Sequence, residues 1–299
     1  MPQSNLVFGL VEKDFQHHRY TSAMMKLVSL SNTHSNDLEF LALLARTQKA
    51  LADFTGLIKT LQVAAEITKS ATDRIKLMTL LYSQGRLNEA LDVGLLLQEM
   101  TLTPAETKML SHCLVKIYVE FSDHEGLQEV ISVSENALND DVLLWANGLV
   151  HLAFGEKNDA LDCFRKAVLV NNLNDQAWVS LSILHEEMGD RELAMANLER
   201  ALDANPTNSI GLKLMTKWYH RDAEQTANMM NKVRHYLAQY EFDEEISLCH
   251  LQMLKEANDL GSARFEVEKL LLNYPANSKY ALMKSDMKKM SEDGMKTQI

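Results

Sequence analysis

Residues that break helices are scarce in this chain, which has only four prolines and eleven glycines among its 299 residues. Sheet-rich proteins need such residues at a turn every few positions, whereas long helices joined by short turns need few of them. Hydrophobic residues make up 46% of the chain, which is enough to build a core. The composition therefore predicts an all-α protein rather than a sheet protein or a disordered chain.

The chain has only three cysteines, Cys113, Cys163 and Cys249, and no two of them form a Cys-x-x-Cys pair. An odd number of widely spaced cysteines supports neither a disulfide framework nor a zinc knuckle. We therefore interpret all three as reduced, small, buried side chains in a reducing compartment. No other residue pattern indicates a metal or a cofactor, and we expect the protein to bind neither.

Basic residues are in the minority: 30 lysines and arginines stand against 41 aspartates and glutamates, a formal net charge of -11. Nucleic-acid binding needs a basic face that displaces counterions, and anionic membrane surfaces attract basic segments. No stretch approaches the ~18 apolar residues of a transmembrane helix, and the N-terminus lacks the basic region of a secretory signal. We therefore expect a cytoplasmic protein that binds no nucleic acid and inserts into no membrane.

Catalytic motifs are absent as well: the sequence has no GxSxG, HExxH, Walker loop or GxGxxG. His17 and His18 are adjacent, so they point to different faces of a helix and make a poor metal pair. The sequence His185-Glu186-Glu187 is half of a zinc motif without the second histidine. We predict that the protein is not an enzyme, while noting that a fold of this class does not by itself exclude catalysis.

What the chain does contain is a pattern that returns after 34 residues without a gap. Segments 141–154 and 158–170, and again 175–188 and 192–204, each read as a pair of amphipathic helices. Gly155 and Gly189 lie at the turns between the two helices of each pair. Asn158 or Asp159 in the first pair, and Asp190 in the second, suit the N-cap of the second helix. The second helices share a small–large–small pattern, formed by Ala160, Phe164 and Ala167 and by Ala194, Leu198 and Ala201.

This pattern resembles the tetratricopeptide repeat, a helix–turn–helix unit of 34 residues. The family's positions are occupied by Trp178, Leu181, Gly189, Ala194, Ala201 and Pro206 in the unit from Asp175, and by Gly148, Gly155, Ala160, Phe164 and Ala167 in the unit from Asp141. Weaker units start near residues 4, 38, 71, 107, 209 and 244. After residue 208 the pattern degrades, because Asn228, Lys232 and His235 take the small–large–small positions.

The resemblance implies a right-handed superhelical solenoid of about eight helix–turn–helix repeats. We expect it to be a single domain over residues 1–290, with a capping helix at 276–290 and a frayed tail at 291–299. One helix pair cannot bury its apolar face alone, whereas stacked pairs bury a continuous core.

In this family, peptides lie in a concave groove lined by the first helices, at the second, fifth, ninth, twelfth and thirteenth positions of each unit. Here these positions are apolar in the middle of the chain and then basic. The candidate groove residues are Tyr82, Tyr118, Trp145, Leu149, Leu152, Val179, Ile183, Lys213, Lys217 and Arg221. A place in the core or on the ordinary surface is an equal alternative for each. Trp145 lies next to the family's packing tryptophan, and a shift of one residue near 107 would bury Tyr118.

We therefore predict a protein–protein interaction scaffold or adaptor, chaperone-like or active in complex assembly. Its ligand would be a peptide or amphipathic helix with apolar anchors and an acidic flank. The resemblance associates such solenoids with bacterial secretion, pilus assembly, motility and signalling. The family's carboxylate clamp for chaperone C-termini is missing, because no three consecutive units carry its residues. The alternative is a self-associating structural protein in which the groove strip is a homo-oligomer interface.

Overall fold

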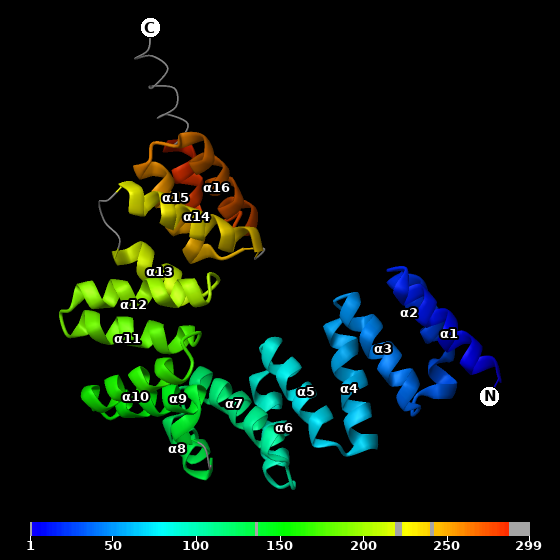
Figure 1. Cartoon of the computed structure of the whole chain (residues 1–299). Coiled ribbons are helices and arrows are strands. Elements are labelled where there is room, and N and C mark those ends of the chain that lie inside the picture. The colour runs from blue at the N-terminus through cyan, green and yellow to red at the C-terminus, as the bar shows by residue number, and fades with distance from the viewer. Residues whose placement is uncertain (1, 135–136, 219–222, 240–241, 287–299) are drawn as a thin grey trace. The chain divides into compact units, whose positions relative to one another are not determined.

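The computed structural model describes residues 2–134, 137–218, 223–239 and 242–286, and every regular element in these ranges is helical (Figure 1). The helices are α1 (Pro2–Gln16), α2 (Tyr20–His34), α3 (Leu38–Ala50), α4 (Phe54–Thr68), α5 (Ala71–Ser83), α6 (Leu87–Gln98), α7 (Pro104–Phe121), α8 (His124–Val133), the short 3-10 helix η1 (Ala137–Asn139), α9 (Asp141–Ala153), α10 (Lys157–Val170), α11 (Asp175–Glu187), α12 (Arg191–Ala204), α13 (Ser209–Trp218), α14 (Ala223–Gln239), α15 (Glu244–Glu256) and α16 (Leu260–Asn273). They confirm the predicted all-α helical-repeat solenoid.

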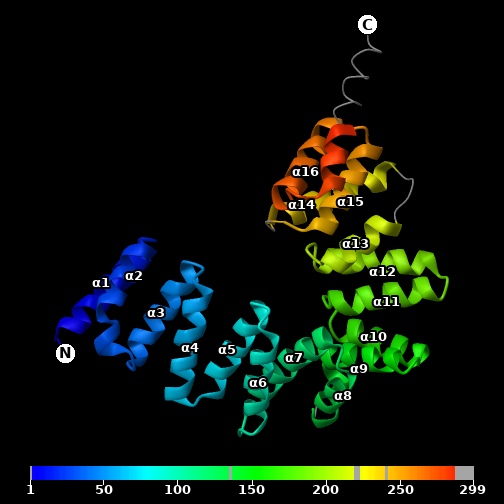
Figure 2. The same cartoon turned by 180° about the vertical axis from the view of Figure 1, so that it is seen from behind.

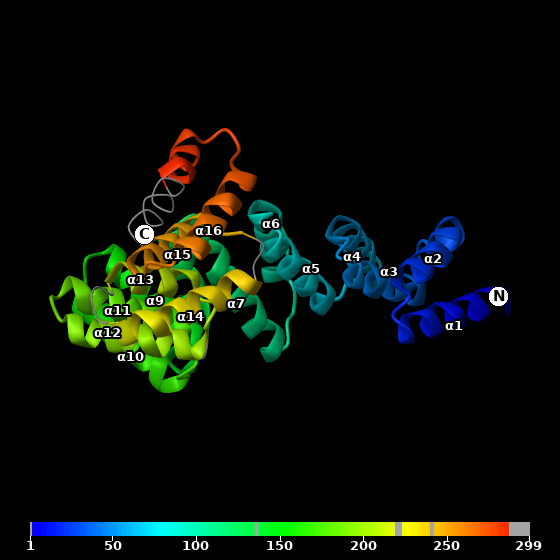
Figure 3. The same ribbon diagram turned by 90° about the horizontal axis from the view of Figure 1, so that it is seen from above.

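The helices form two compact units, residues 1–138 and 139–299. Figure 3 shows α1–α2 and α3–α4 as successive hairpins of the first unit. Figure 2 shows α9–α10 and α11–α12 lying side by side in the second. One continuous solenoid over residues 1–290 and its right-handed superhelix remain predictions. No helix in the described ranges is long and apolar enough to cross a bilayer.

The first helices begin where the 34-residue spacing predicted a unit at 38, 71, 141, 175, 209 and 244. Helix α7 begins at Pro104, three residues before the repeat position at 107, as a proline in the first turn of a helix indicates. The Thr103 side chain accepts a hydrogen bond from the Glu106 backbone N–H at 3.3 Å, and the Glu106 carboxylate accepts one from the Thr103 N–H at 3.0 Å. This capping box, with proline at the first helical position, starts the helix three residues early.

Most second helices begin at an aspartate cap. The side chain of Asp190 accepts a hydrogen bond from the Leu193 backbone N–H at 3.1 Å, as predicted. The predicted cap of α10 was wrong: this helix begins at Lys157, its N-cap is Glu156, and the Glu156 side chain makes no capping bond. Asp159 therefore lies inside the first turn of α10 and is not the N-cap of this helix.

The two helices of a pair approach closely where a small residue faces a large one. A Cβ atom added to Gly148 of α9 would come within 2.4 Å of the Phe164 ring of α10, and Phe164 is fully buried. In the next pair, the same two positions hold Ser182 and Leu198. A larger residue on the first helix is thus matched by a smaller one on the second.

Successive pairs of the second unit are joined by asparagine and aspartate side chains. Asn174 caps α11 by accepting from the Ala177 N–H at 2.9 Å, and its amide donates to the Asp141 carboxylate at 2.9 Å. Asn208 repeats this arrangement, accepting from the Gly211 N–H at 2.8 Å and donating to Asp175 at 2.6 Å. A second asparagine, Asn171 or Asn205, donates to the same carboxylate, so two amides at each joint fix one pair against the next.

The predicted capping helix begins at residue 278 and is helical to 286; residues 287–290 and the predicted tail at 291–299 lie outside the described residues. Tyr280 fixes it to the repeat before it. This side chain is buried and donates a hydrogen bond to the Glu244 carboxylate of α15. That bond, with burial and the negative charge of Glu244, raises the pKa of Tyr280 to about 12.

A buried histidine–glutamate pair joins α15 to α16. His250 Nδ1 lies 3.0 Å from Glu266 Oε2, and both residues are less than a tenth exposed. Burial opposes ionisation of Glu266, but the hydrogen bond from His250 and the charge of Lys269 outweigh it, so the pKa of Glu266 lies below its ordinary value. Glu266 is thus bound in its ionised form in the folded state.

We expect Gly148→Ser to destabilise the protein by about 1–3 kcal/mol, because its Cβ would overlap the Phe164 ring. Phe164→Leu alone should also destabilise, by leaving a cavity. The double variant, which copies the Ser182–Leu198 pair of the next repeat, should recover part of the combined loss. Urea unfolding of the three variants and the wild type measures this, and strictly additive losses would contradict the packing argument.

We expect stability to fall in acid through Glu266. A carboxylate whose folded pKa is depressed contributes stability above its unfolded pKa, ordinarily 4.5, and loses it as the pH falls through the folded pKa. The free energy of unfolding should therefore decline below about pH 4.5, and Glu266→Gln should flatten this decline. Glu268→Gln, a more exposed carboxylate on the same helix, is the control and should retain the wild-type slope. Equal slopes in both variants would contradict the assignment.

Candidate partner-binding surface

Adjacent first helices contact each other through side chains about one repeat apart, and this row of contacts contains several candidate groove residues. In the first unit, the Tyr82 hydroxyl of α5 donates to Glu120 of α7 at 3.4 Å. In the second, the Trp145 indole of α9 donates to Ser180 of α11 at 3.0 Å. The first-helix side of each unit is therefore a half-buried surface fixed by polar contacts.

In the first unit, the two candidate tyrosines differ in environment. Tyr82 is half-buried, and burial together with the charge of Glu120 raises the pKa of its hydroxyl, which stays protonated. Tyr118 is only 6% exposed, and a Cβ on Gly126 of α8 would come within 2.6 Å of its ring. Tyr118 thus packs against the second helix α8, as a shift of one residue near 107 would place it. Tyr118 belongs to the core, and its placement in the groove is corrected.

In the second unit, the apolar candidates line the edge of the core. Trp145, Leu149 and Leu152 are half-buried and pack against the cluster around Phe164. Ile183 of α11 is likewise half-buried, against the next cluster. Val179 is only 3% exposed and lies inside that cluster, so it cannot line an open groove and its assignment is corrected. The four remaining residues, Trp145, Leu149, Leu152 and Ile183, form what we call the apolar strip.

A pocket of about 370 Å³ lies between α13, α14 and α15 of the second unit. Its volume is within the range of small-ligand and side-chain pockets. Two candidate residues, Lys213 and Lys217, line it from α13. The other lining residues are Thr216, Met229, Glu245, Leu248, Cys249, Gln252, Met253 and Glu256. The pocket thus combines an apolar lining of leucine and methionine with charges of both signs.

The charges around this pocket are more balanced than the sequence indicated. Lys213 Nζ lies 2.7 Å from Glu245 Oε2, and this hydrogen bond raises the pKa of Lys213. Lys232 of α14 pairs with Asp203 at 3.1 Å. Lys217 is exposed. The candidate Arg221 lies outside the described residues.

The contribution of α15 to the pocket was missed by the sequence analysis, although a signal for it existed. The groove positions of the family, applied to the unit that starts at 244, give Glu245, Leu248, Gln252, Lys255 and Glu256. Four of these five residues line the pocket, and Lys255 does not. Cys249 lies between them, and its Sγ accepts a hydrogen bond from the Thr216 hydroxyl at 3.2 Å.

Comparison with known proteins agrees with this architecture. Residues 175–208 match the tetratricopeptide repeat family. Among solved structures, a tetratricopeptide repeat protein from Parabacteroides merdae ATCC 43184 is similar, with 15% identity, a TM-score of 0.50, and coverage of 83% of this chain and 98% of that chain. The APC/C hetero-tetramer Cut9-Hcn1 contains a chain with 11% identity and a TM-score of 0.54, covering 82% of this chain.

This chain spans 48% of the matched chain in the Cut9-Hcn1 structure, about half its length. At such low identities the likeness shows the fold alone. No curated protein sequence matches the chain. The repeat at residues 175–208 and the succession of helix pairs nevertheless agree with each other. The chain thus contains a tetratricopeptide repeat at residues 175–208, within an all-α helical-repeat solenoid.

Proposed function

We propose that this protein is an interaction scaffold that binds a segment of a partner protein on the first helices of its second unit. The observation that carries the proposal is the pocket between α13, α14 and α15, which is lined by residues at the family's groove positions. Folds of this kind generally act as non-catalytic scaffolds, and we assign no reaction to the chain.

The lining of the pocket suggests the chemistry of the segment that it would bind. Leu248, Met229 and Met253 offer an apolar surface, and flexible methionines adapt to side chains of different shape. An apolar anchor of the partner, such as a leucine or phenylalanine, fits this lining. Lys217 at the rim would pair with a carboxylate beside the anchor. Because Glu245 and Glu256 are also present, a single acidic residue suits the site better than an acidic run.

The apolar strip on α9 and α11 supports an extended or helical ligand rather than an isolated side chain. Trp145, Leu149 and Ile183 keep part of their apolar surface accessible to solvent, and a bound segment would cover it. The Cut9-Hcn1 structure is a hetero-tetramer of two kinds of chain, which is compatible with a role in complex assembly. The competing proposal is that a second copy of this protein covers the strip.

We expect Leu248→Glu and Lys217→Glu to weaken partner binding, the first by placing a charge against the apolar anchor and the second by repelling the carboxylate. A lost anchor should cost at least ~2 kcal/mol, or roughly thirty-fold in Kd. Leu169→Glu is the matched control, because Leu169 is 84% exposed on the second helix α10, away from the pocket. The partner is first recovered by affinity purification with the wild type, and its Kd is then measured by calorimetry for each variant.

Unchanged affinity in both pocket variants would move the site elsewhere and contradict the proposal. Recovery of only the protein itself, with a mass that rises with concentration in light scattering, would favour self-association. A strictly monomeric protein at high concentration would exclude that alternative.

A further inference from the structure

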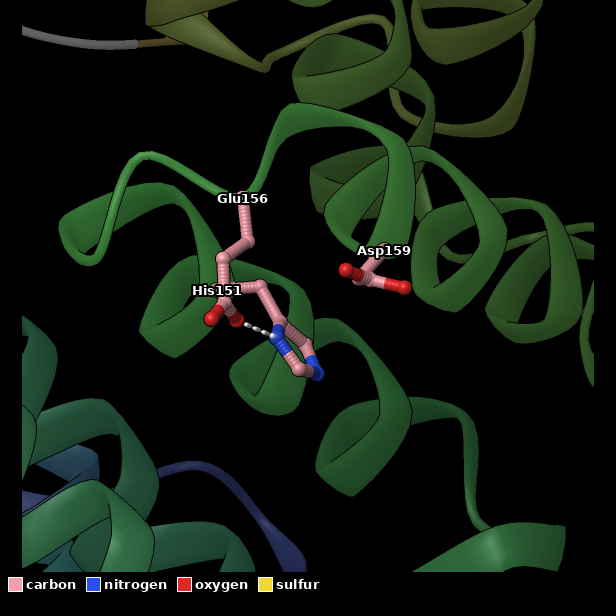
Figure 4. Close-up of side chains that lie close together, drawn as sticks. All are labelled: His151, Glu156 and Asp159. Atoms are coloured by element: carbon pink, nitrogen blue, oxygen red, sulfur yellow. Dashed lines mark hydrogen bonds and ion pairs between the residues drawn. The ribbon is translucent and has the colours of Figure 1, made fainter.

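Among the described residues, one group of metal-ligating side chains comes together outside the pocket: His151, Glu156 and Asp159 (Figure 4). Their donor atoms all lie within 4.8 Å of one another. Figure 4 shows the Glu156 carboxylate on His151 and the Asp159 carboxylate beside the same ring. His151 Nδ1 is 2.6 Å from Glu156 Oε2. The group therefore places one imidazole nitrogen and two carboxylates within reach of a single ion.

The turn between α9 and α10 holds these side chains in place through its backbone. His151 lies in the last turn of α9, and its carbonyl accepts a hydrogen bond from the Glu156 N–H at 2.9 Å. Gly155 makes this reversal possible with a φ of +77°, a conformation that glycine adopts without strain. Asp159 then follows in the first turn of α10. The ligands are thus fixed by short-range structure, not by the packing of distant elements.

Glu156 is used differently from the residue that occupies its place in the next repeat. There, Asp190 points its carboxylate at the helix and caps α12. Glu156 leaves α10 without a side-chain cap and turns its carboxylate to the histidine. The next repeat also has a histidine, His185, but it is buried, and Leu193 replaces the third ligand. Among the described residues, the three-ligand group is therefore found at this turn alone.

We propose that His151, Glu156 and Asp159 form a binding site for a divalent ion of the zinc type. Zinc takes imidazole nitrogen and carboxylate oxygen together, whereas calcium and magnesium prefer oxygen alone. An ion would take the place of the hydrogen between His151 Nδ1 and Glu156 Oε2, with Asp159 as the third ligand. Bond lengths of ~2.0–2.2 Å require the donors to move closer to a common centre. The exposed side chains of Glu156 and Asp159 are able to turn for this.

Three protein ligands leave at least one coordination position of a tetrahedral ion open. Water fills it in the isolated protein, and a histidine or carboxylate of a bound protein would fill it in a complex. The site lies on the turn of the α9–α10 pair and does not depend on the pocket or on the proposed function.

The test is a calorimetric titration of untagged, chelator-treated protein with Zn²⁺. We expect one Zn²⁺ ion to bind per chain. Asp159→Asn and His151→Ala should each raise the Kd for Zn²⁺ more than ~10-fold. The matched control is Asp162→Asn, which removes the same charge from an exposed position one turn further along α10. It should bind as the wild type does. Circular dichroism of each variant checks that the helices remain.

Absence of zinc binding to the wild type would overturn the proposal. So would equal affinity in the wild type, Asp159→Asn and His151→Ala, because the ion would then bind at other residues, such as the cysteines. If His151→Ala lost helix content, Asp159→Asn would still decide, since Asp159 is exposed and makes no capping bond.

Discussion

The structure depends on close contact between the two helices of each pair. A helix pair has too little apolar surface to be stable alone, so every pair must present a smooth, well-packed face to the next. Gly148 under Phe164 and Gly126 beside Tyr118 reach this packing in opposite ways, with the small residue on the first helix in one pair and on the second helix in the other. Volume is thus conserved across the pair while the identity of each residue changes.

This constraint also determines which residues are left for function. The side of a first helix that faces the core is buried, and Tyr118 and Val179 lie on this side. The side that faces neighbouring first helices is only half-buried, because it contacts them through isolated polar pairs such as Trp145 with Ser180. In the second unit, α13 and α15 leave a pocket between them. Half-buried apolar side chains such as Trp145 and Leu149 are therefore left accessible on the first helices.

Much of the fold could be predicted from the sequence because its signals are local. Ala160, Phe164 and Ala167 return 34 residues later, and a spacing of that kind fixes the helix starts near 141 and 175. The register failed at α7, where Tyr118 lies in the core against Gly126 of α8 instead of lining the groove.

The candidate site was predictable only in part. Lys213 and Lys217 follow from the groove positions, but the charge of the pocket does not, because Glu245 reaches Lys213 from a different repeat. The grouping of His151, Glu156 and Asp159 escaped the search for metal motifs for a related reason. The three residues lie on both sides of the turn between α9 and α10, so they do not share the face of a single helix.

The asparagine joints have a consequence for how the chain can change in length. Residues 175–208 contain every side chain that one joint needs. The carboxylate of Asp175 accepts hydrogen bonds from the side-chain amides of Asn205 and Asn208. A second copy of this segment placed directly after Asn208 would bring its own aspartate and asparagines, and its last asparagine would cap α13 as the present one does. The following joint lacks this property, because Asp243 caps α15 and a carboxylate has no hydrogen to donate. A copy of the repeat inserted after residue 208 would therefore supply the donors and the acceptor for both of the joints that flank it. The middle of the second unit can thus accept an additional repeat without a change of sequence.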